Sequence, residues 1–239
     1  MIFKNKNIKN PNLIFTNFSG LHSYPPTPAV KNMPEWYLKT PGYMGNDAKK
    51  IVTPKGNPHT IKKCIPVFDA ISSGYIIYTQ VDVQISKING ETFYHWSDAN
   101  FITFHTILQA ELHPSANKNL GDFPKFMNPY AIKTPPGYSC LFVQPLHRES
   151  KFTIFPGIVD TDTYTSQVNF PFILNDENWE GIIPAGTPMA QVIPFKRESW
   201  THSFGSEKEI KEEQLVSQKL RSMFFNAYKK HFWHKKNYD

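Results

Sequence analysis

The chain has 239 residues, of which 40% are hydrophobic, 15% aromatic and 19% charged, and its formal net charge is +6. Large apolar side chains are too frequent for an intrinsically disordered protein, and the 20 prolines exclude a coiled coil or a helical bundle. Many prolines together with many aromatic and β-branched residues predict a β-rich domain whose turns are fixed by proline.

The basic excess is concentrated toward the two ends of the chain. Its residues are Lys4, Lys6, Lys9, Lys219, Arg221, Lys229, Lys230, Lys235 and Lys236. Basic ends are often solvated tails, so we expect no nucleic-acid partner.

Cys64 and Cys140 are the only cysteines, and both lie in apolar sequence. Two distant cysteines do not form a disulfide scaffold, so we expect buried thiols in a reducing compartment. No stretch is long and apolar enough to cross a membrane. The N-terminal segment, with its Asn, Lys and Pro residues, lacks the apolar core of a signal peptide. We therefore expect a cytoplasmic protein with no transmembrane segment.

Residues 1–60 show no sustained hydrophobic period, which predicts an N-terminal arm that wraps over a domain. Residues 25–28 form a polyproline-type segment. Residues 33–38 predict a short helix with Pro34 in its first turn. The Lys-, Gly- and Pro-rich residues 40–58 indicate a loop.

Residues 61–200 predict the β domain. A strand is expected at 75–78, and the alternation of apolar and polar residues at 81–85 marks a half-buried strand. Asn89-Gly90 predicts a hairpin turn before a return strand at 92–96. Further strands are expected at 139–144, 153–155, 167–174 and 189–195, and the Pro/Gly turns between them favour a sandwich or a barrel.

Residues 201–239 predict an amphipathic C-terminal helix. Ile210, Leu220, Phe224 and Tyr228 fit a helical stripe over residues 207–235, and acidic residues at its start with basic residues at its end suit the helix dipole. Ser206 is the expected N-cap. We expect this helix to pack on the β domain or across a subunit interface. A membrane-surface helix is the alternative, which the acidic first half opposes.

Four segments of the β domain follow one another in a recognisable order: residues 73–83, residues 135–139 with 146–150, residues 156–164, and residues 183–193. Together they resemble the β-clip fold of trimeric dUTPases and dCTP deaminases. The resemblance implies a mainly β, dUTPase-like β-clip or barrel fold with an N-terminal arm and a C-terminal α-helix. It also implies a homotrimer that binds a nucleoside phosphate between subunits, with Mg as cofactor if the chain is an enzyme.

The resemblance carries site residues with it. Asp160 matches the carboxylate that deprotonates the attacking water, and Tyr164, displaced by one place, matches the tyrosine under the deoxyribose. Gly157 belongs to the same nucleotide-binding hairpin. The plainer interpretations are that Asp160 closes a turn and that Tyr164 is a cross-strand tyrosine.

The phosphate contacts implied by the resemblance are Arg148, Ser150 and Gln191. An arginine can neutralise phosphate oxygens and bind two of them at once; the plainer interpretation of Arg148 is a surface ion pair. The sequence also departs from the family pattern, because Ile76 stands where the first motif has an aspartate. Met189 stands where a basic residue precedes Ala-Gln.

The chain is also similar to a family of mostly phage-encoded proteins of unknown function, which would place it in the host cytoplasm. Two functions therefore stay open. One is an enzyme, or a former enzyme, that binds or hydrolyses a nucleoside phosphate. The alternative is a non-enzymatic phage structural, assembly or host-interaction protein on the same fold, favoured by the departures at Ile76 and Met189. No residues are assigned to a metal by the sequence itself.

Overall fold

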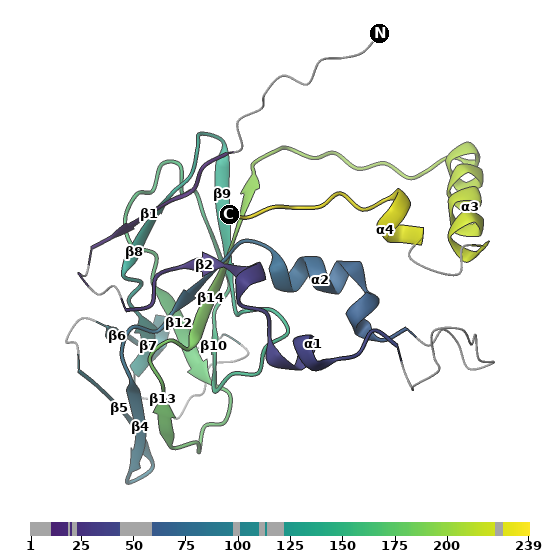
Figure 1. Cartoon of the computed structure of the whole chain (residues 1–239). Coiled ribbons are helices and arrows are strands. Elements are labelled where there is room, and N and C mark those ends of the chain that lie inside the picture. The colour runs from purple at the N-terminus through teal and green to yellow at the C-terminus, as the bar shows by residue number, and fades with distance from the viewer. Residues whose placement is uncertain are drawn as a thin grey trace. The chain divides into compact units, whose positions relative to one another are not determined.

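The computed structural model describes residues 11–18, 20, 23–43, 59–97, 101–109, 113, 122–222 and 227–239 (Figure 1). The chain divides into two compact units. Unit 1 comprises residues 1–27 and 74–197, and unit 2 comprises residues 28–73 and 198–239. The sequence-based division into segments 1–60, 61–200 and 201–239 stays a prediction.

Unit 1 is built from antiparallel strands, and the boundary between the units falls inside β2 (Thr27–Pro28). The other strands are β1 (Ile14–Asn17), β3 (Tyr75–Tyr78), β4 (Val83–Ile88), β5 (Glu91–Trp96), β6 (Ile102–Thr106), β7 (Asp122–Phe126), β8 (Tyr130–Lys133), β9 (Tyr138–Val143), β10 (Phe152–Ile154), β11 (Gly157–Val159), β12 (Phe170–Leu174), β13 (Gly181–Ile183) and β14 (Pro188–Lys196). A 3-10 turn, η3 (Ile107–Gln109), follows β6.

These strands form four sheets, with the orders β11-β9-β14-β3-β2, β10-β12-β7-β6, β13-β4-β5 and β1-β8. The ladders do not join into a closed barrel within the described residues. The mainly β fold with a C-terminal helix that the sequence predicted is thereby confirmed, in its open form.

The core of unit 1 explains the high phenylalanine content. In β12 the side chains alternate, so that Phe170, Phe172 and Leu174 are buried while their neighbours are partly exposed. The Phe172 ring stacks on that of Phe126 with the centroids 3.9 Å apart, and Phe152 packs edge-on against both. Burial of these rings supplies much of the apolar area that stabilises the unit.

The hairpin between β4 and β5 forms as predicted. Asn89 and Gly90 both have positive φ, of 53° and 85°, as a two-residue turn of this kind requires. The register pairs Ile88 with Glu91 and continues to Val83 with Trp96.

Unit 2 contains the α-helices of the described residues. Its elements are η1 (Ala29–Lys31), α1 (Glu35–Lys39), η2 (Ile61–Lys63), α2 (Ile65–Ser72), α3 (Glu207–Ser222) and α4 (Ala227–His231). The ring centroid of Phe68 on α2 lies 6.5 Å from that of Tyr37 on α1 and 6.4 Å from that of Trp233. No helix in the described part of the chain is long and apolar enough to span a bilayer.

The C-terminal helix differs from its prediction in extent. Ser206 stands at the N-cap position of α3, and its hydroxyl and backbone N–H both donate to Glu209 Oε2, at 2.9 and 2.7 Å. Glu209 thereby forms its half of a capping box. The predicted stripe position Phe224 lies outside the described residues. The second helical segment closes at His231, because the N–H groups of Phe232 and Trp233 both donate to the carbonyl of Tyr228. Residues 233–239 then continue without helix.

Candidate functional site

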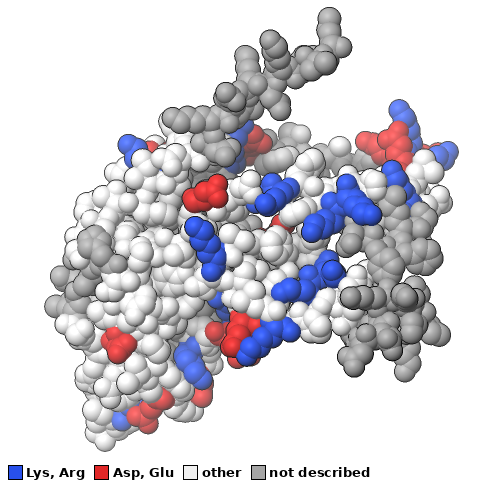
Figure 2. Space-filling model, viewed as in Figure 1, with Lys and Arg blue, Asp and Glu red and all other residues white. Residues whose placement is uncertain are grey.

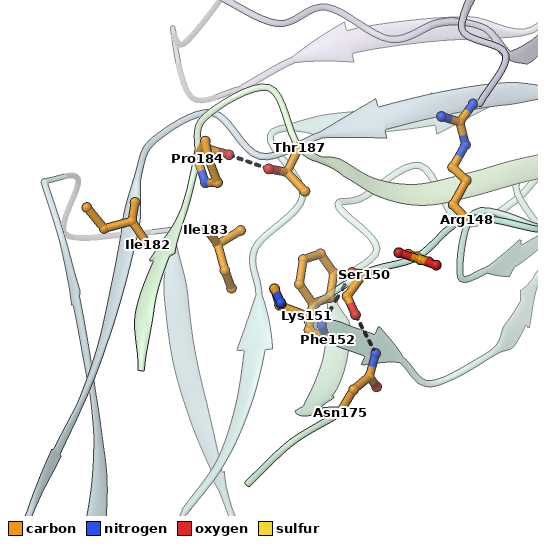
Figure 3. A pocket seen from close by; sticks show the side chains of 10 residues that line it. Arg148, Ser150, Lys151, Phe152, Asn175, Ile182, Ile183, Pro184 and Thr187 are labelled. Atoms are coloured by element: carbon orange, nitrogen blue, oxygen red, sulfur yellow. Dashed lines mark hydrogen bonds between the residues drawn. The ribbon is translucent and has the colours of Figure 1, made fainter. Parts of the chain in front are cut away.

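A pocket of about 570 Å³ lies in unit 1 (Figure 3). Its lining residues come from the loop before β10, from β10 itself, from the end of β12 and from β13 with the turn that follows it. They are Arg148, Glu149, Ser150, Lys151, Phe152, Asn175, Ile182, Ile183, Pro184 and Thr187. Figure 3 shows Ile182, Ile183 and Pro184 on one side, and Ser150 and Asn175 on the other. The pocket therefore has an apolar wall and a polar wall.

The polar wall is fixed by hydrogen bonds around Asn175. Its Nδ2 donates to the carbonyl of Ser150 at 2.8 Å, and its Oδ1 accepts from Thr153 Oγ1 at 2.6 Å. The Ser150 hydroxyl accepts from Phe152 N at 3.3 Å. Since that bond uses the hydroxyl oxygen as acceptor, its hydrogen can still donate to an anion in the pocket.

Lys151 brings an exposed ammonium group to the pocket. Its Nζ lies 5.6 Å from the centre of the Trp179 ring, which limits where the cation can point. Trp179 is itself confined by Gly181, because a Cβ at Gly181 would lie 2.8 Å from the indole. Two cations and one carboxylate, that of Glu149, line the pocket.

Arg148 lines the pocket from a different position. Its head group stands apart from Ser150 and points away from that hydroxyl (Figure 3). Burial lowers the pKa of the Arg148 guanidinium, and nearby Tyr78 opposes this shift. The predicted pair Arg148 and Ser150 thus shares one pocket, while their polar atoms do not point to the same place in it.

Gln191 supports the loop that leads to Arg148. It is fully buried in β14, and its Oε1 accepts from Leu146 N at 2.9 Å. The next residue, His147, has a φ of +56°, a strained value for a residue other than glycine. Gln191 therefore holds the loop in place and does not line the pocket.

Asp160 belongs to a second polar cluster, at the start of β9. Its Oδ1 accepts from the Ser139 hydroxyl at 2.6 Å and lies 3.2 Å from Arg197 Nη1. Arg197 also binds Asp162 with both nitrogens, at 2.8 and 2.5 Å. The same guanidinium therefore bridges two carboxylates.

Asp162 is the more firmly held of the two carboxylates. Besides Arg197, the backbone N–H of Gly137 donates to its Oδ2 at 2.8 Å. The hydrogen bonds from Arg197 and Gly137 lower the pKa of Asp162 to about 2. Gly137 has a φ of +83°, so the predicted Pro-Pro-Gly turn is what aims this N–H at the carboxylate.

Tyr164 and Gly157 flank this cluster. The Tyr164 side chain is 47% exposed, and its hydroxyl donates to the carbonyl of Gln167 at 3.2 Å. A Cβ added at Gly157 would meet no atom within 4 Å. Neither residue lines the pocket, so the hairpin offers an exposed ring and open space on the surface of its own chain.

The two predicted halves of the site lie at opposite ends of β9. Ser139, which binds Asp160, is near the start of the strand, whereas Val143 at its end pairs with Gln191. Four residues of strand span about 13 Å. A single chain therefore does not bring Asp160 to the same point as the loop that Gln191 supports.

The donor set does not fit a magnesium ion. Mg²⁺ is bound through carboxylates, and the two carboxylates of the cluster are already bound to Arg197. Ile76, where the resemblance in sequence would lead one to expect an aspartate, is fully buried in the core. In the described part of the chain no three His, Cys, Asp or Glu side chains are grouped so as to hold a metal.

Sequence reasoning missed Lys151, Asn175, Asp162 and Arg197. Lys151 directly follows the predicted phosphate-loop residue Ser150, so its place in the sequence could have identified it as a candidate phosphate contact. Asp162 stands in the quoted Asp-Thr-Asp stretch. For Arg197 and Asn175 no local pattern marks the role, because each meets its partners across strands that are far apart in sequence.

Solved structures of two phage enzymes resemble part of this chain. A dUTPase mutant from phage phi11 of S. aureus, whose structure reveals the coordination of a structural Mg(II) ion, is 12% identical, with a TM-score of 0.31. The matched region covers 57% of this chain and 85% of the phi11 dUTPase chain. A dUTPase mutant from Staphylococcus bacteriophage 80alpha, solved with dUpNHpp, is 13% identical, with a TM-score of 0.29. The matched region covers 56% of this chain and 75% of the 80alpha dUTPase chain.

No protein-family model matches the sequence, and neither does any curated protein. Identity and TM-score at this level assign no activity and no site residue to this chain.

Proposed function

We propose that the protein binds a nucleoside phosphate in the pocket of unit 1, and that a neighbouring copy in a homotrimer supplies the Asp160–Tyr164 hairpin. The observation that carries this proposal is the pocket's pairing of a cationic, hydroxyl-bearing wall with an apolar one. Its volume of about 570 Å³ falls in the usual range for small-molecule sites.

The two walls suit the two ends of such a ligand. Lys151 and the Ser150 hydroxyl can neutralise and hydrogen-bond phosphate oxygens. The exposed side chains of Ile182 and Pro184 offer the apolar contact that a base or a sugar face needs. Arg148 adds positive charge elsewhere in the same pocket.

The geometry along β9 supports a site shared between copies. Asp160 and the Gln191-supported loop are separated by about 13 Å of strand. A second chain can bring its own hairpin to the pocket, and the exposed Tyr164 ring and open space at Gly157 leave room for that approach.

Binding without fast hydrolysis is the form of this function that the contacts support. A general base must have its lone pair available for the proton of water. The Asp160 carboxylate accepts from Ser139 and lies against Arg197, so the guanidinium competes for the charge that a base would use. The buried Ile76 supports the same view. This is the observation that favours the second candidate, a non-enzymatic assembly module on the same fold.

A thermal-shift panel of nucleoside and deoxynucleoside mono-, di- and triphosphates, with and without magnesium, tests the proposal. We expect a deoxyuridine or deoxycytidine phosphate to raise the melting temperature. Lys151→Gln should abolish the shift and Tyr164→Ala should reduce it. Lys133→Gln, which removes an exposed charge from β8, is the matched control and should respond like the natural chain.

Phosphate release on the same samples separates the two candidates. Ligand stabilisation without nucleotide turnover is the expected result. Turnover that Asp160→Asn abolishes would instead establish the enzyme. The absence of a shift with every nucleotide, from a chain that still forms its oligomer, would overturn nucleotide binding and leave the assembly module.

A further inference from the structure

The basic C-terminal end of unit 2 packs against α2. The Trp233 Nε1–H lies 3.0 Å from both carboxylate oxygens of Asp69 on α2, and Lys236 Nζ lies 2.6 Å from Asp69 Oδ2. The Trp233 ring also packs edge-on against Phe68. The sequence alone assigned these charges to a solvated end, whereas these contacts hold residues 233 and 236 on α2.

Cations are numerous in part of unit 2. Residues 28–43, 59–73 and 227–239 carry eight lysines against three side-chain carboxylates, whereas residues 198–222 of the same unit carry five carboxylates against four lysine and arginine side chains. Two of the three carboxylates are already paired, Glu35 with Lys39 and Asp69 with Lys236. Figure 2 shows several blue side chains over the region of α2 and the C-terminal segment, with red side chains at the edge of this group. We call this the basic face; its exposed lysines outside these two ion pairs are Lys31, Lys63, Lys229, Lys230 and Lys235.

Several lysines of unit 2 are held close to aromatic rings. Lys63 Nζ lies 5.0 Å from the centre of Tyr43, and Lys229 Nζ lies 5.6 Å from the centre of Trp233. Lys62 is held more firmly, donating to the carbonyl of Tyr37 at 2.5 Å. Cations placed in this way lose less conformational freedom when they bind an anion.

We propose that the basic face binds nucleic acid through its phosphate backbone, independently of base sequence. An excess of exposed lysines is the electrostatic footprint of such binding. A helix that inserts into an anionic membrane needs an apolar face, whereas purely electrostatic binding to lipid headgroups needs none and is tested separately with vesicles. In the C-terminal segment Phe232 and Trp233 turn inward and are half-buried, while Lys229, Lys230 and Lys235 are exposed.

The test is fluorescence anisotropy of the full chain with labelled 20-nucleotide single strands and 20-base-pair duplexes, titrated at several salt concentrations. We expect binding that weakens steeply with salt. The double variant Lys230→Gln/Lys235→Gln should bind about tenfold more weakly, and the slope of log K against log salt should fall by about one per lysine removed.

The matched control is Lys208→Gln/Lys211→Gln, which removes two exposed charges from α3 and should bind like the natural chain. Lys151→Gln should also retain oligonucleotide binding, so a failure of the pocket is distinguishable from a failure of the basic face. Circular dichroism checks that each variant is folded.

Three results would overturn the proposal: no binding at low salt, equal weakening by the α3 pair, or binding to phosphatidylserine vesicles without binding to either oligonucleotide. Equal weakening by the α3 pair would mean that binding depends only on the net charge of the chain. Binding to vesicles alone would mean that the basic face binds a lipid surface.

Discussion

Arg197 is the residue that organises the cluster at the start of β9. Its Nη1 lies 3.2 Å from Asp160, its two nitrogens bind Asp162, and its backbone N–H donates to the carbonyl of Gly137. The two carboxylates differ in their surroundings: the Asp162 side chain is 6% exposed, and that of Asp160 is 60% exposed. Arg197 therefore acts on Asp162 mainly as a structural partner, and on Asp160 as a competitor for its charge.

The low pKa of Asp162 makes stability depend on pH in a definite direction. The pKa of about 2 in the folded chain lies below the ordinary aspartate value. The ionised form therefore stabilises the fold above about pH 4, and this contribution is lost as the pH falls toward about 2. We expect Asp162→Asn to lower the urea midpoint at pH 7, with a difference from the natural chain that shrinks across that interval.

Glu91→Gln serves as the control, because it neutralises an exposed carboxylate at the β4–β5 turn. It should leave the urea midpoint unchanged at both ends of the pH range. A constant difference between Asp162→Asn and the natural chain from pH 7 to about pH 2 would contradict the account of the ion pair.

The residue-level prediction from sequence was partial for a physical reason. The motifs identified Arg148 and Ser150, which do line the pocket, because turn residues and their neighbours are local signals. Arg197 reaches Asp162 only because β9 pairs with both β11 and β14. Such a meeting depends on sheet topology, which no residue spacing encodes.

At the scale of elements, the contact between Gly74 and β14 sets the path of the central sheet. Gly74 has a φ of +70°, and a Cβ there would lie 1.9 Å from the carbonyl oxygen of Val192. Val192 pairs with Tyr75, so the close approach occurs where β3 enters the sheet.

Gly74→Ala should destabilise the chain by several kcal/mol, because the clash is with backbone and cannot be relieved by a rotamer change. Gly137→Ala is the matched control. It has a φ of +83° with nothing within 4 Å of its added Cβ, so it should cost only about 1–2 kcal/mol. Urea unfolding measures both, and equal losses would contradict the role assigned to the Val192 contact.

The elements with strong local signals were predictable. The Asn89-Gly90 turn and the strands beside it formed as expected, because two positive φ values select those residues. The pairing of β1 with β8 was not predicted, nor was the three-residue strand β13. Short strands give too few alternations to detect, and a partner more than a hundred residues away leaves no local trace.

At the scale of the molecule, each compact unit combines segments from distant parts of the sequence. Hydrophobic period and composition report contiguous stretches, so they could indicate the β-rich region but not this grouping. The same limit applies to self-association, which depends on a second copy.

The proposed shared site predicts an oligomer with a mass three times the 27.6 kDa of one chain. Size-exclusion chromatography with light scattering measures this directly, and we expect a single trimeric species across a tenfold dilution. A monomer at every concentration would contradict a site completed by a neighbouring copy.

The central claim is that a nucleoside phosphate binds between the Lys151 pocket of one copy and the Tyr164 hairpin of another. Isothermal titration of a non-hydrolysable deoxynucleoside triphosphate into refolded 1:1 mixtures of Lys151→Gln and Tyr164→Ala tests it most directly. Each variant alone should bind weakly or not at all. Random mixing in a trimer should restore about a quarter of the sites, because those pair an intact pocket with an intact hairpin. A mixture that binds no better than its two components would contradict the claim.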